Sequence, residues 1–333
     1  MYGAAENAAA AAAAAERTAF RGAEKRYKLY KTLPHRPKSR MKTTSGTKPT
    51  DLSDVVDFKA VLESFASGRD LPTGILRFDC DGFDRPVFCI DDRPGFFFIP
   101  SALTIEEQCY WIRESLATFP QPPNRTNLTA IYGQFMVYLM LLKIRSVHRV
   151  ETCKSIAALA LLKKLRWSTL GLQFDWSKRN YDVSLPHNKI PDALCTLAKK
   201  MAVPALPFGE DFHPEAAIVN YFGPSDMLGG HLDDMELDWT RPIVSISLGC
   251  KAIFLLGGKT REDVPIAMFL RSGDIVLMAG EARECFHGVP RIFTDDGHAE
   301  ISAILSQFSA EDDRCYADYI RNSRININIR QVN

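Results

Sequence analysis

Short, mostly apolar runs recur along the second half of the chain. From about residue 166 onward these runs are β-like in composition, and Gly, Pro and Asp separate them. This pattern is typical of a β-sandwich or barrel. It predicts strands at 168–174, 216–222, 243–248, 252–256, 266–270, 274–278, 286–292, 301–308 and 325–329.

Helical spacing appears mostly ahead of these strands, at residues 54–65, and once between them, at residues 192–201. Thr104 followed by Glu107 forms a capping box, which predicts a further helix starting at residue 105. Helices placed mostly before a run of strands predict an α+β fold. We expect a double-stranded β-helix, or jelly roll, buttressed by helices.

Two further segments complete the pattern. Residues 95–100 are predicted to form a short buried strand, whereas residues 132–164 are apolar and basic without a clear period and predict no element. The jelly-roll core is therefore expected over about 166–333.

Charge divides the chain into two parts. Residues 1–50 contain eleven Lys or Arg and three Glu, a net charge of +8, whereas residues 51–333 carry −7. We expect a basic, partly disordered N-terminal arm over 1–50 and one folded catalytic domain over 51–333. The aromatic residues interleaved with basic ones at 21–31 suit phosphate and base contacts. A solvated tail is the alternative interpretation.

Several classes of protein are not indicated. The eight cysteines are scattered without a CxxC pair, which favours free thiols over a disulfide frame or a zinc site. The longest apolar stretch, 135–142, is far shorter than the roughly 20 residues of a membrane span, so we expect no membrane association. We expect the protein to be localised in the nucleus and cytoplasm. The alanine run at 8–15 could belong to a transit peptide, so localisation in an organelle is the alternative.

Three residues offer the ligands of a non-haem iron site, which uses two histidines and one carboxylate. In His231-Leu-Asp233 the spacing of two places both side chains on one side of an extended chain, and Gly229-Gly230 allows close backbone approach. His287 follows in a predicted short strand. Because His-x-Asp arises often by chance, and a core histidine is a common alternative, context must support the assignment.

Residues 324–330 alternate strictly between polar residues and isoleucine. One face therefore carries Arg324, Asn326, Asn328 and Arg330. In a closed sheet that face would be buried, and buried arginines require anions such as the carboxylates of a dicarboxylate. An edge strand with a solvated polar face is the alternative.

The order and spacing of these motifs resemble the AlkB family of Fe(II)/2-oxoglutarate dioxygenases. Asn220-Tyr-Phe stands eleven residues before His231-x-Asp233, a distant His287 follows, and Arg324-x-Asn326-x-x-x-Arg330 closes the chain. The similarity covers most of 51–333 and is greatest to the first AlkB homologue of animals and plants. The segments that carry this closer match are 93–100, 165–171, 252–258 and 272–275.

The resemblance implies Fe(II) as metal, with 2-oxoglutarate and O2 as cosubstrates. His231, Asp233 and His287 would bind iron, and Arg324 would bind the distal carboxylate of 2-oxoglutarate. The residues implied to line the rest of the cosubstrate site are Asn220, Tyr221, Phe222, Asn326 and Arg330. Many relatives have a tyrosine where Phe222 stands, so one hydroxyl contact would be missing here.

The segment before the barrel core is similar to the family's nucleotide-recognition region. Its candidate substrate-binding residues are Trp167, Gln173, Phe174, Asp175 and Trp176. Aromatic rings there suit stacking on an extruded base, and packing in the core is the alternative.

The function implied by the resemblance is oxidative demethylation of bases in nucleic acid, as in DNA repair or DNA demethylation. Candidate substrates are 1-methyladenine in tRNA and N6-methyladenine in DNA, with formaldehyde, succinate and CO2 as products. Nucleic acid is the expected partner, and no obligate protein partner is predicted. A protein or small-molecule hydroxylase on the same fold is the alternative, because ligation of iron and 2-oxoglutarate does not determine the substrate. An inactive scaffold would be indicated by a missing ligand, and none is missing.

Overall fold

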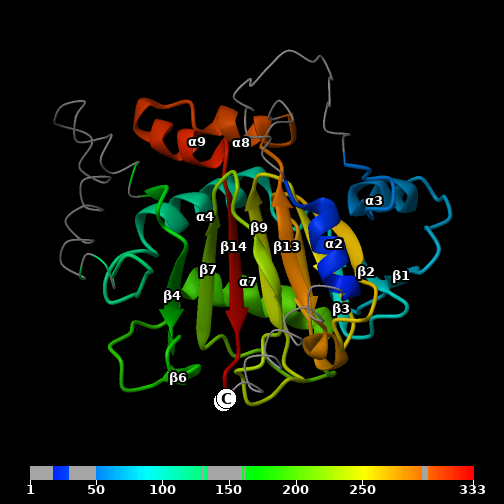
Figure 1. The fold of residues 1–333 in the computed structure, drawn as a ribbon, viewed down its shortest axis with the longest axis horizontal. Coiled ribbons are helices and arrows are strands. Elements are labelled where there is room, and N and C mark those ends of the chain that lie inside the picture. Colours follow the sequence, from blue (N-terminus) through cyan, green and yellow to red (C-terminus); the bar gives the residue numbers. More distant parts are fainter. Residues whose placement is uncertain are drawn as a thin grey trace, which may run out of the picture.

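Two antiparallel sheets form the centre of the molecule (Figure 1). The computed structural model describes residues 18–29, 50–129, 131, 133, 160, 162–294 and 299–333. The larger sheet has the strand order β1 (Ile75–Phe78), β2 (Val87–Ile90), β3 (Phe96–Ile99), β12 (Ile275–Met278), β9 (Ile243–Gly249), β14 (Arg324–Arg330), β7 (Ala216–Phe222) and β4 (Trp167–Gly171). The smaller sheet has the order β11 (Ile266–Leu270), β10 (Ala252–Leu256), β13 (His287–Ile292) and β8 (Leu228–His231).

Most of the helices cover the outer faces of these sheets, and one packs on the apolar core between them. Their bounds are α2 (Ala19–Tyr27), α3 (Phe58–Ala66), α4 (Ile105–Ala117), α7 (Asp192–Ala202), α8 (Ser302–Gln307) and α9 (Arg314–Ile320). One apolar core joins α4, α7, α8 and α9 to a single face of the larger sheet. The capping box at Thr104 is present at the start of α4, as predicted. None of the described helices is long and apolar enough to cross a membrane.

Strand β14 lies in the middle of the larger sheet, between β9 and β7, so it is not an edge strand. Its isoleucines pack in the core beneath the helices, and its polar residues face the smaller sheet. Arg324 and Arg330 are only 1% and 5% exposed. The alternation in the sequence therefore produces a buried polar face, which is the face that carries the site.

The predicted strand at 301–308 is wrong, because this segment forms α8 and a preceding 3-10 turn. Its buried residues are Ile301, Ile304 and Phe308, spaced by three and four positions, which is the period of a helix face. The predicted strand at 168–174 is divided into β4 and the hairpin strand β5 (Gln173–Asp175), which pairs with β6 (Asn180–Asp182). Most of residues 132–164 lie outside the described residues.

Part of the predicted N-terminal arm is helical. Helix α2 lies beside β13 on the outer face of the smaller sheet, where Phe20 and Tyr27 join an apolar cluster (Figure 1). Tyr27 is 2% exposed and its hydroxyl donates to Asp54 Oδ1 at 2.9 Å, so in this position its ring is not available to stack on a base. Residues 1–17 and 30–49 of the predicted arm lie outside the described residues.

Candidate metal centre and cosubstrate pocket

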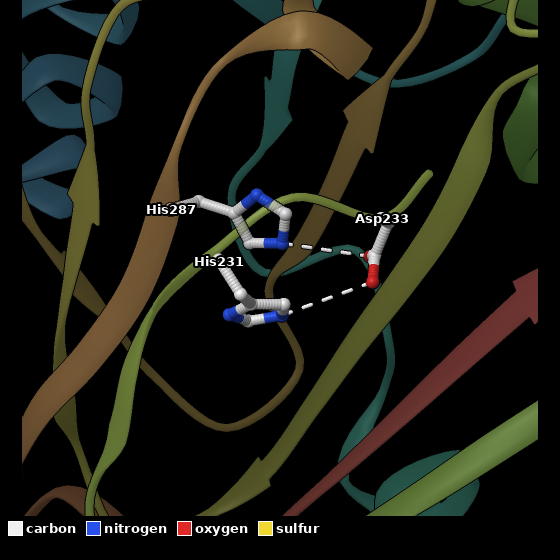
Figure 2. Close-up of side chains that lie close together, drawn as sticks. All are labelled: His231, Asp233 and His287. Atoms are coloured by element: carbon white, nitrogen blue, oxygen red, sulfur yellow. Dashed lines mark ion pairs between the residues drawn. The ribbon is translucent and has the colours of Figure 1, made fainter. Parts of the chain in front are cut away.

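The structure brings His231, Asp233 and His287 together. His231 ends β8 and His287 begins β13, and the two are paired in register across the strands. The Nε2 atoms of His231 and His287 lie 3.8 and 3.5 Å from the carboxylate oxygens of Asp233 (Figure 2). One candidate ligand atom from each residue lies within 4.8 Å of the others. Two imidazoles and one carboxylate on one side of a site form the ligand set of a non-haem iron centre.

Backbone carbonyls orient both rings. His231 Nδ1 lies 2.9 Å from Gly229 O, and His287 Nδ1 lies 3.2 Å from Cys285 O. A proton on each Nδ1 leaves Nε2 as the free ligand atom. Burial, with His287 beside it, lowers the pKa of His231 to about 4, so its ring is neutral at pH 7. Burial raises the pKa of Asp233, but Arg330 and the two histidines outweigh it and hold that pKa well below its usual value.

A buried network of charges fixes Asp233. Arg330 forms an ion pair with Asp233, with Nη2 3.0 Å from Oδ2, and it donates from Nη1 to Glu236 Oε1 at 2.8 Å. Arg283 binds the other oxygen of Glu236 and also donates to the main-chain oxygen of Asp233 at 3.0 Å. The hydroxyl of Tyr181 adds a third donor to Glu236 at 2.8 Å. Arg330, which was predicted to contact the cosubstrate, thus pairs with a metal ligand in this structure, and it is not among the residues that line the pocket between the triad and Arg324.

We expect Glu236→Gln to destabilise the protein. The substitution removes one of two anions that balance Arg283 and Arg330, and breaking such a buried pair costs about 3–5 kcal/mol. Urea unfolding at neutral pH measures the loss. Glu210→Gln is the control, because Glu210 pairs with Arg241 at a side chain that is 43% exposed and should change the free energy of unfolding by less than about 1 kcal/mol. Equal losses in the two variants would contradict a stabilising role for the buried network.

Arg324 is a buried cation with an incomplete set of partners. Its Nη2 donates to Ser247 Oγ at 3.0 Å, whereas Nε and Nη1 have no hydrogen-bond partner in the described part of the chain. Its guanidinium also lies 5.3 Å from the centre of the Phe222 ring. Burial lowers the pKa of Arg324 to about 10. Because a buried cation is costly unless an anion pairs with it, this position is suited to a carboxylate ligand.

One pocket joins the triad to Arg324. Its polar wall includes Asn326 and Asn328, and Asn326 Nδ2 is held by Ser245 Oγ at 2.9 Å. The apolar wall includes Ile243, Phe254 and Met278. A dicarboxylate in this pocket can therefore reach a metal at one end and a guanidinium at the other. The residues fit iron and 2-oxoglutarate.

None of Asn220, Tyr221 and Phe222, which were predicted to line the cosubstrate site, is among the residues lining this pocket. Asn220 is half-buried opposite Asn326 on the same sheet face. Tyr221 lies on the opposite, helix-covered face, because successive residues of a strand alternate between faces. Its hydroxyl donates to Ser115 O at 2.6 Å, so the structure does not bring Tyr221 into the cosubstrate site.

The predicted substrate residues also divide into two groups. Gln173 is fully buried, and its amide binds main-chain groups of Arg125 and Gly171. Asp175 accepts from the main chain and hydroxyl of Ser177 within the hairpin turn. These two polar side chains hold the β5–β6 hairpin in shape, so their hydrogen bonds are made within the chain.

The aromatic residues form a cluster at the hairpin. The Trp176 ring lies 5.5 Å from Trp167 and 4.7 Å from Phe174, and Tyr181 lies 5.2 Å from Phe174. Phe174 is buried, whereas Trp176 is 48% exposed. Trp176 is therefore the member of the cluster most open to a ligand.

Several site residues were not predicted from the sequence. Two of them are Ser245 and Ser247, which hydrogen-bond to Asn326 and Arg324. They are the two polar residues of an otherwise apolar strand and lie two positions apart, so the sequence could have predicted that both face the site. Glu236 and Arg283 carry no such signal, because they meet only in the folded chain.

The comparisons with known proteins agree with this geometry. A family model described as 2OG-Fe(II) oxygenase superfamily matches residues 95–330. The chain is 58% identical to the DNA N(6)-methyladenine demethylase ALKBH1A of Arabidopsis thaliana, over 96% of this chain and 97% of that protein. It is 34% identical to the nucleic acid dioxygenase ALKBH1 of Homo sapiens, over 72% of this chain and 64% of the human protein. It is 30% identical to the tRNA demethylase abh1 of Schizosaccharomyces pombe, over 74% of this chain and 82% of that protein.

Members of this superfamily use Fe(II), 2-oxoglutarate and O2, and the triad, Arg324 and the pocket between them suit that chemistry. The chain belongs to the 2OG-Fe(II) oxygenase superfamily and, within it, to the AlkB family of dioxygenases, in the branch of the first AlkB homologue.

Proposed function

We propose that this enzyme oxidatively demethylates bases in nucleic acid, and that N6-methyladenine in DNA is its first candidate substrate. The observation that carries the proposal is one pocket that contains both the metal triad and Arg324, whose Nε and Nη1 have no hydrogen-bond partner among the described residues. The choice of substrate is supported by the relative named as a DNA N(6)-methyladenine demethylase, which is similar over almost the whole chain. 1-Methyladenine in tRNA is the second candidate, supported by the relative named as a tRNA demethylase.

The reaction divides between the bound metal and the chain. Iron with 2-oxoglutarate and O2 supplies the oxidation that places a hydroxyl on the methyl carbon, with succinate and CO2 as coproducts. The hydroxymethyl group then leaves the base nitrogen as formaldehyde, and the nitrogen recovers its proton. Arg324 would hold the distal carboxylate of 2-oxoglutarate, while Arg330 keeps Asp233 ionised and in place. The apolar wall of the pocket excludes bulk water.

The β5–β6 hairpin is suited to hold the base. Base stacking on aromatic rings is tolerant of sequence, and Trp176 presents an exposed ring beside Trp167. Tyr181 of the same hairpin donates to Glu236, which holds Arg330 and through it Asp233. The hairpin is thereby connected to the metal centre by hydrogen bonds.

Anaerobically iron-loaded protein should be given 2-oxoglutarate and oxygen with one of three nucleic acids. These are single-stranded DNA containing N6-methyladenine, its unmethylated counterpart, and tRNA containing 1-methyladenine. We expect the methylated DNA to stimulate succinate formation, with formaldehyde released and the methyl mark lost in equal amounts by mass spectrometry. A larger stimulation by the tRNA would indicate that 1-methyladenine in tRNA is the preferred substrate.

The proposal fails if neither methylated nucleic acid raises succinate formation above the rate without substrate, although iron and 2-oxoglutarate are bound. That result would favour the hydroxylation of a protein or small molecule in the same pocket. Loss of the mark without formaldehyde would also contradict it, because oxidative demethylation releases one formaldehyde for each methyl group.

A further inference from the structure

Helix α2 packs directly behind the strand that carries His231. The ring of Phe20 lies so close to Gly230 and Gly257 that a Cβ atom at either residue would come within 2.3 and 2.9 Å of it. The main-chain N–H of Phe20 donates to Arg261 O at 3.0 Å. The helix is thus closely fitted to β8, which is the edge strand of the smaller sheet.

The polar contact between α2 and β8 is made by a buried carboxylate. Glu24 is 4% exposed, and its Oε1 accepts from Gly230 N at 2.6 Å. Its other oxygen is paired with Arg21 Nη1 at 2.7 Å, which fixes the orientation of the carboxylate. An edge strand has N–H groups without a strand partner, and Glu24 satisfies one of them immediately before His231.

Gly230 N and Gly229 O belong to one planar peptide unit, so the position of one fixes the other. Gly229 O is the atom that lies 2.9 Å from His231 Nδ1 and orients the imidazole. The next peptide is held as well, because Arg261 Nη2 donates to Gly230 O at 2.7 Å. Two consecutive glycines have wide conformational freedom, so this segment needs contacts from outside to keep one orientation.

We propose that α2 is part of the metal centre and that Glu24 is a positioning residue, which fixes the Gly229–Gly230 peptide and thereby the ring of His231. Arg261 holds the following peptide from the other side. The inference concerns metal binding and is independent of which nucleic acid or other molecule is the substrate. A segment predicted from its charge to be an arm therefore contributes to the geometry of the iron ligands.

The test is cobalt(II) binding to the full chain, because cobalt(II) replaces iron without oxidising. Calorimetry gives its affinity, and the visible absorption spectrum reports the ligand geometry. We expect Glu24→Ala to weaken cobalt binding about 10- to 100-fold, the range for outer residues that orient a metal ligand. Glu24→Gln should recover most of the affinity, because its amide oxygen can accept from Gly230 N–H.

The control is Arg26→Ala on the same helix, since Arg26 pairs with Asp54 at 2.6 Å and its side chain is half-exposed. This variant should bind cobalt as the unchanged protein does. The proposal is overturned if Glu24→Ala keeps full affinity and spectrum, if Arg26→Ala loses as much, or if Glu24→Gln is as weak as Glu24→Ala. If Glu24→Ala fails to fold, cobalt binding is measured in Glu24→Asp instead. Aspartate keeps the negative charge, but its shorter side chain moves the carboxylate oxygen away from Gly230 N–H. Full affinity in that variant also overturns the proposal.

Discussion

Asp233→Asn should abolish 2-oxoglutarate turnover and iron binding, and because Asp233 also pairs with buried Arg330, circular dichroism is used to compare the fold of the variant with that of the unchanged protein. The amide is a neutral and poor metal ligand, and the two histidines alone do not complete the triad. We expect metal affinity to fall by more than about 100-fold, which is the upper range for residues that only orient a ligand. Iron content after anaerobic loading and succinate formation measure the two losses.

The neighbouring carboxylate provides a matched control. Asp234 faces away from the site and pairs with Arg179, whose side chain is 68% exposed. Asp234→Asn should therefore retain iron and turnover. If Asp233→Asn also keeps its iron and its activity, Asp233 is not a metal ligand.

Arg324→Lys should raise the KM for 2-oxoglutarate about 10- to 100-fold, because a hydrogen bond between charged groups contributes about 1.5–3 kcal/mol. Lysine keeps the charge but cannot form the paired contact that a planar guanidinium makes with a carboxylate. The turnover number at saturating 2-oxoglutarate should change less than KM, because the residue binds the distal end of the cosubstrate. Steady-state succinate formation separates the two constants.

The exposed Arg321 serves as the comparison for this variant. Arg321→Lys should leave both constants unchanged. An unchanged KM in Arg324→Lys, or a loss confined to the turnover number, would contradict the assignment of Arg324 to the distal carboxylate.

Most strands of the two sheets could be predicted because they are short, mostly apolar runs bounded by Gly, Pro and Asp. The runs at 216–222, 243–248, 252–256 and 266–270 coincide with β7, β9, β10 and β11 to within one residue. For the segment 301–308 a strand could not be distinguished from a helix in this way, since a short apolar run fits either. Every third or fourth residue of this segment is buried by packing against α4 and the larger sheet, and that packing exists only in the folded protein.

Strand β8 shows a different limit. Leu228-Gly-Gly-His231 has no alternating apolar residues, so the sequence predicts no strand there. The three candidate metal ligands, which the structure brings together, could nevertheless be predicted, because their residue types and spacing indicate the chemistry without the secondary structure. By contrast, the Glu236 network required the fold, since its members come from four separate segments.

Helix α2 shows why a buried acid is difficult to predict. Phe20, Glu24 and Tyr27 are spaced by four and three residues and are all buried, which is the pattern of one helix face. From the sequence alone, a glutamate at the middle position is expected to lie in solvent. The high positive charge of residues 1–50 likewise predicts a basic, partly disordered arm. Only the tertiary contact with Gly230 explains its burial.

The most direct test of the account is an anaerobic titration of the iron-loaded protein with 2-oxoglutarate, followed by visible absorption. Chelation of iron(II) by the 2-oxo acid produces a charge-transfer band. We expect a band that saturates at one 2-oxoglutarate per chain. The band should be absent in Asp233→Asn and should require higher concentrations of 2-oxoglutarate in Arg324→Lys. No band in the unchanged protein, or an undiminished band in Asp233→Asn, would contradict the assignment of this pocket to iron and 2-oxoglutarate.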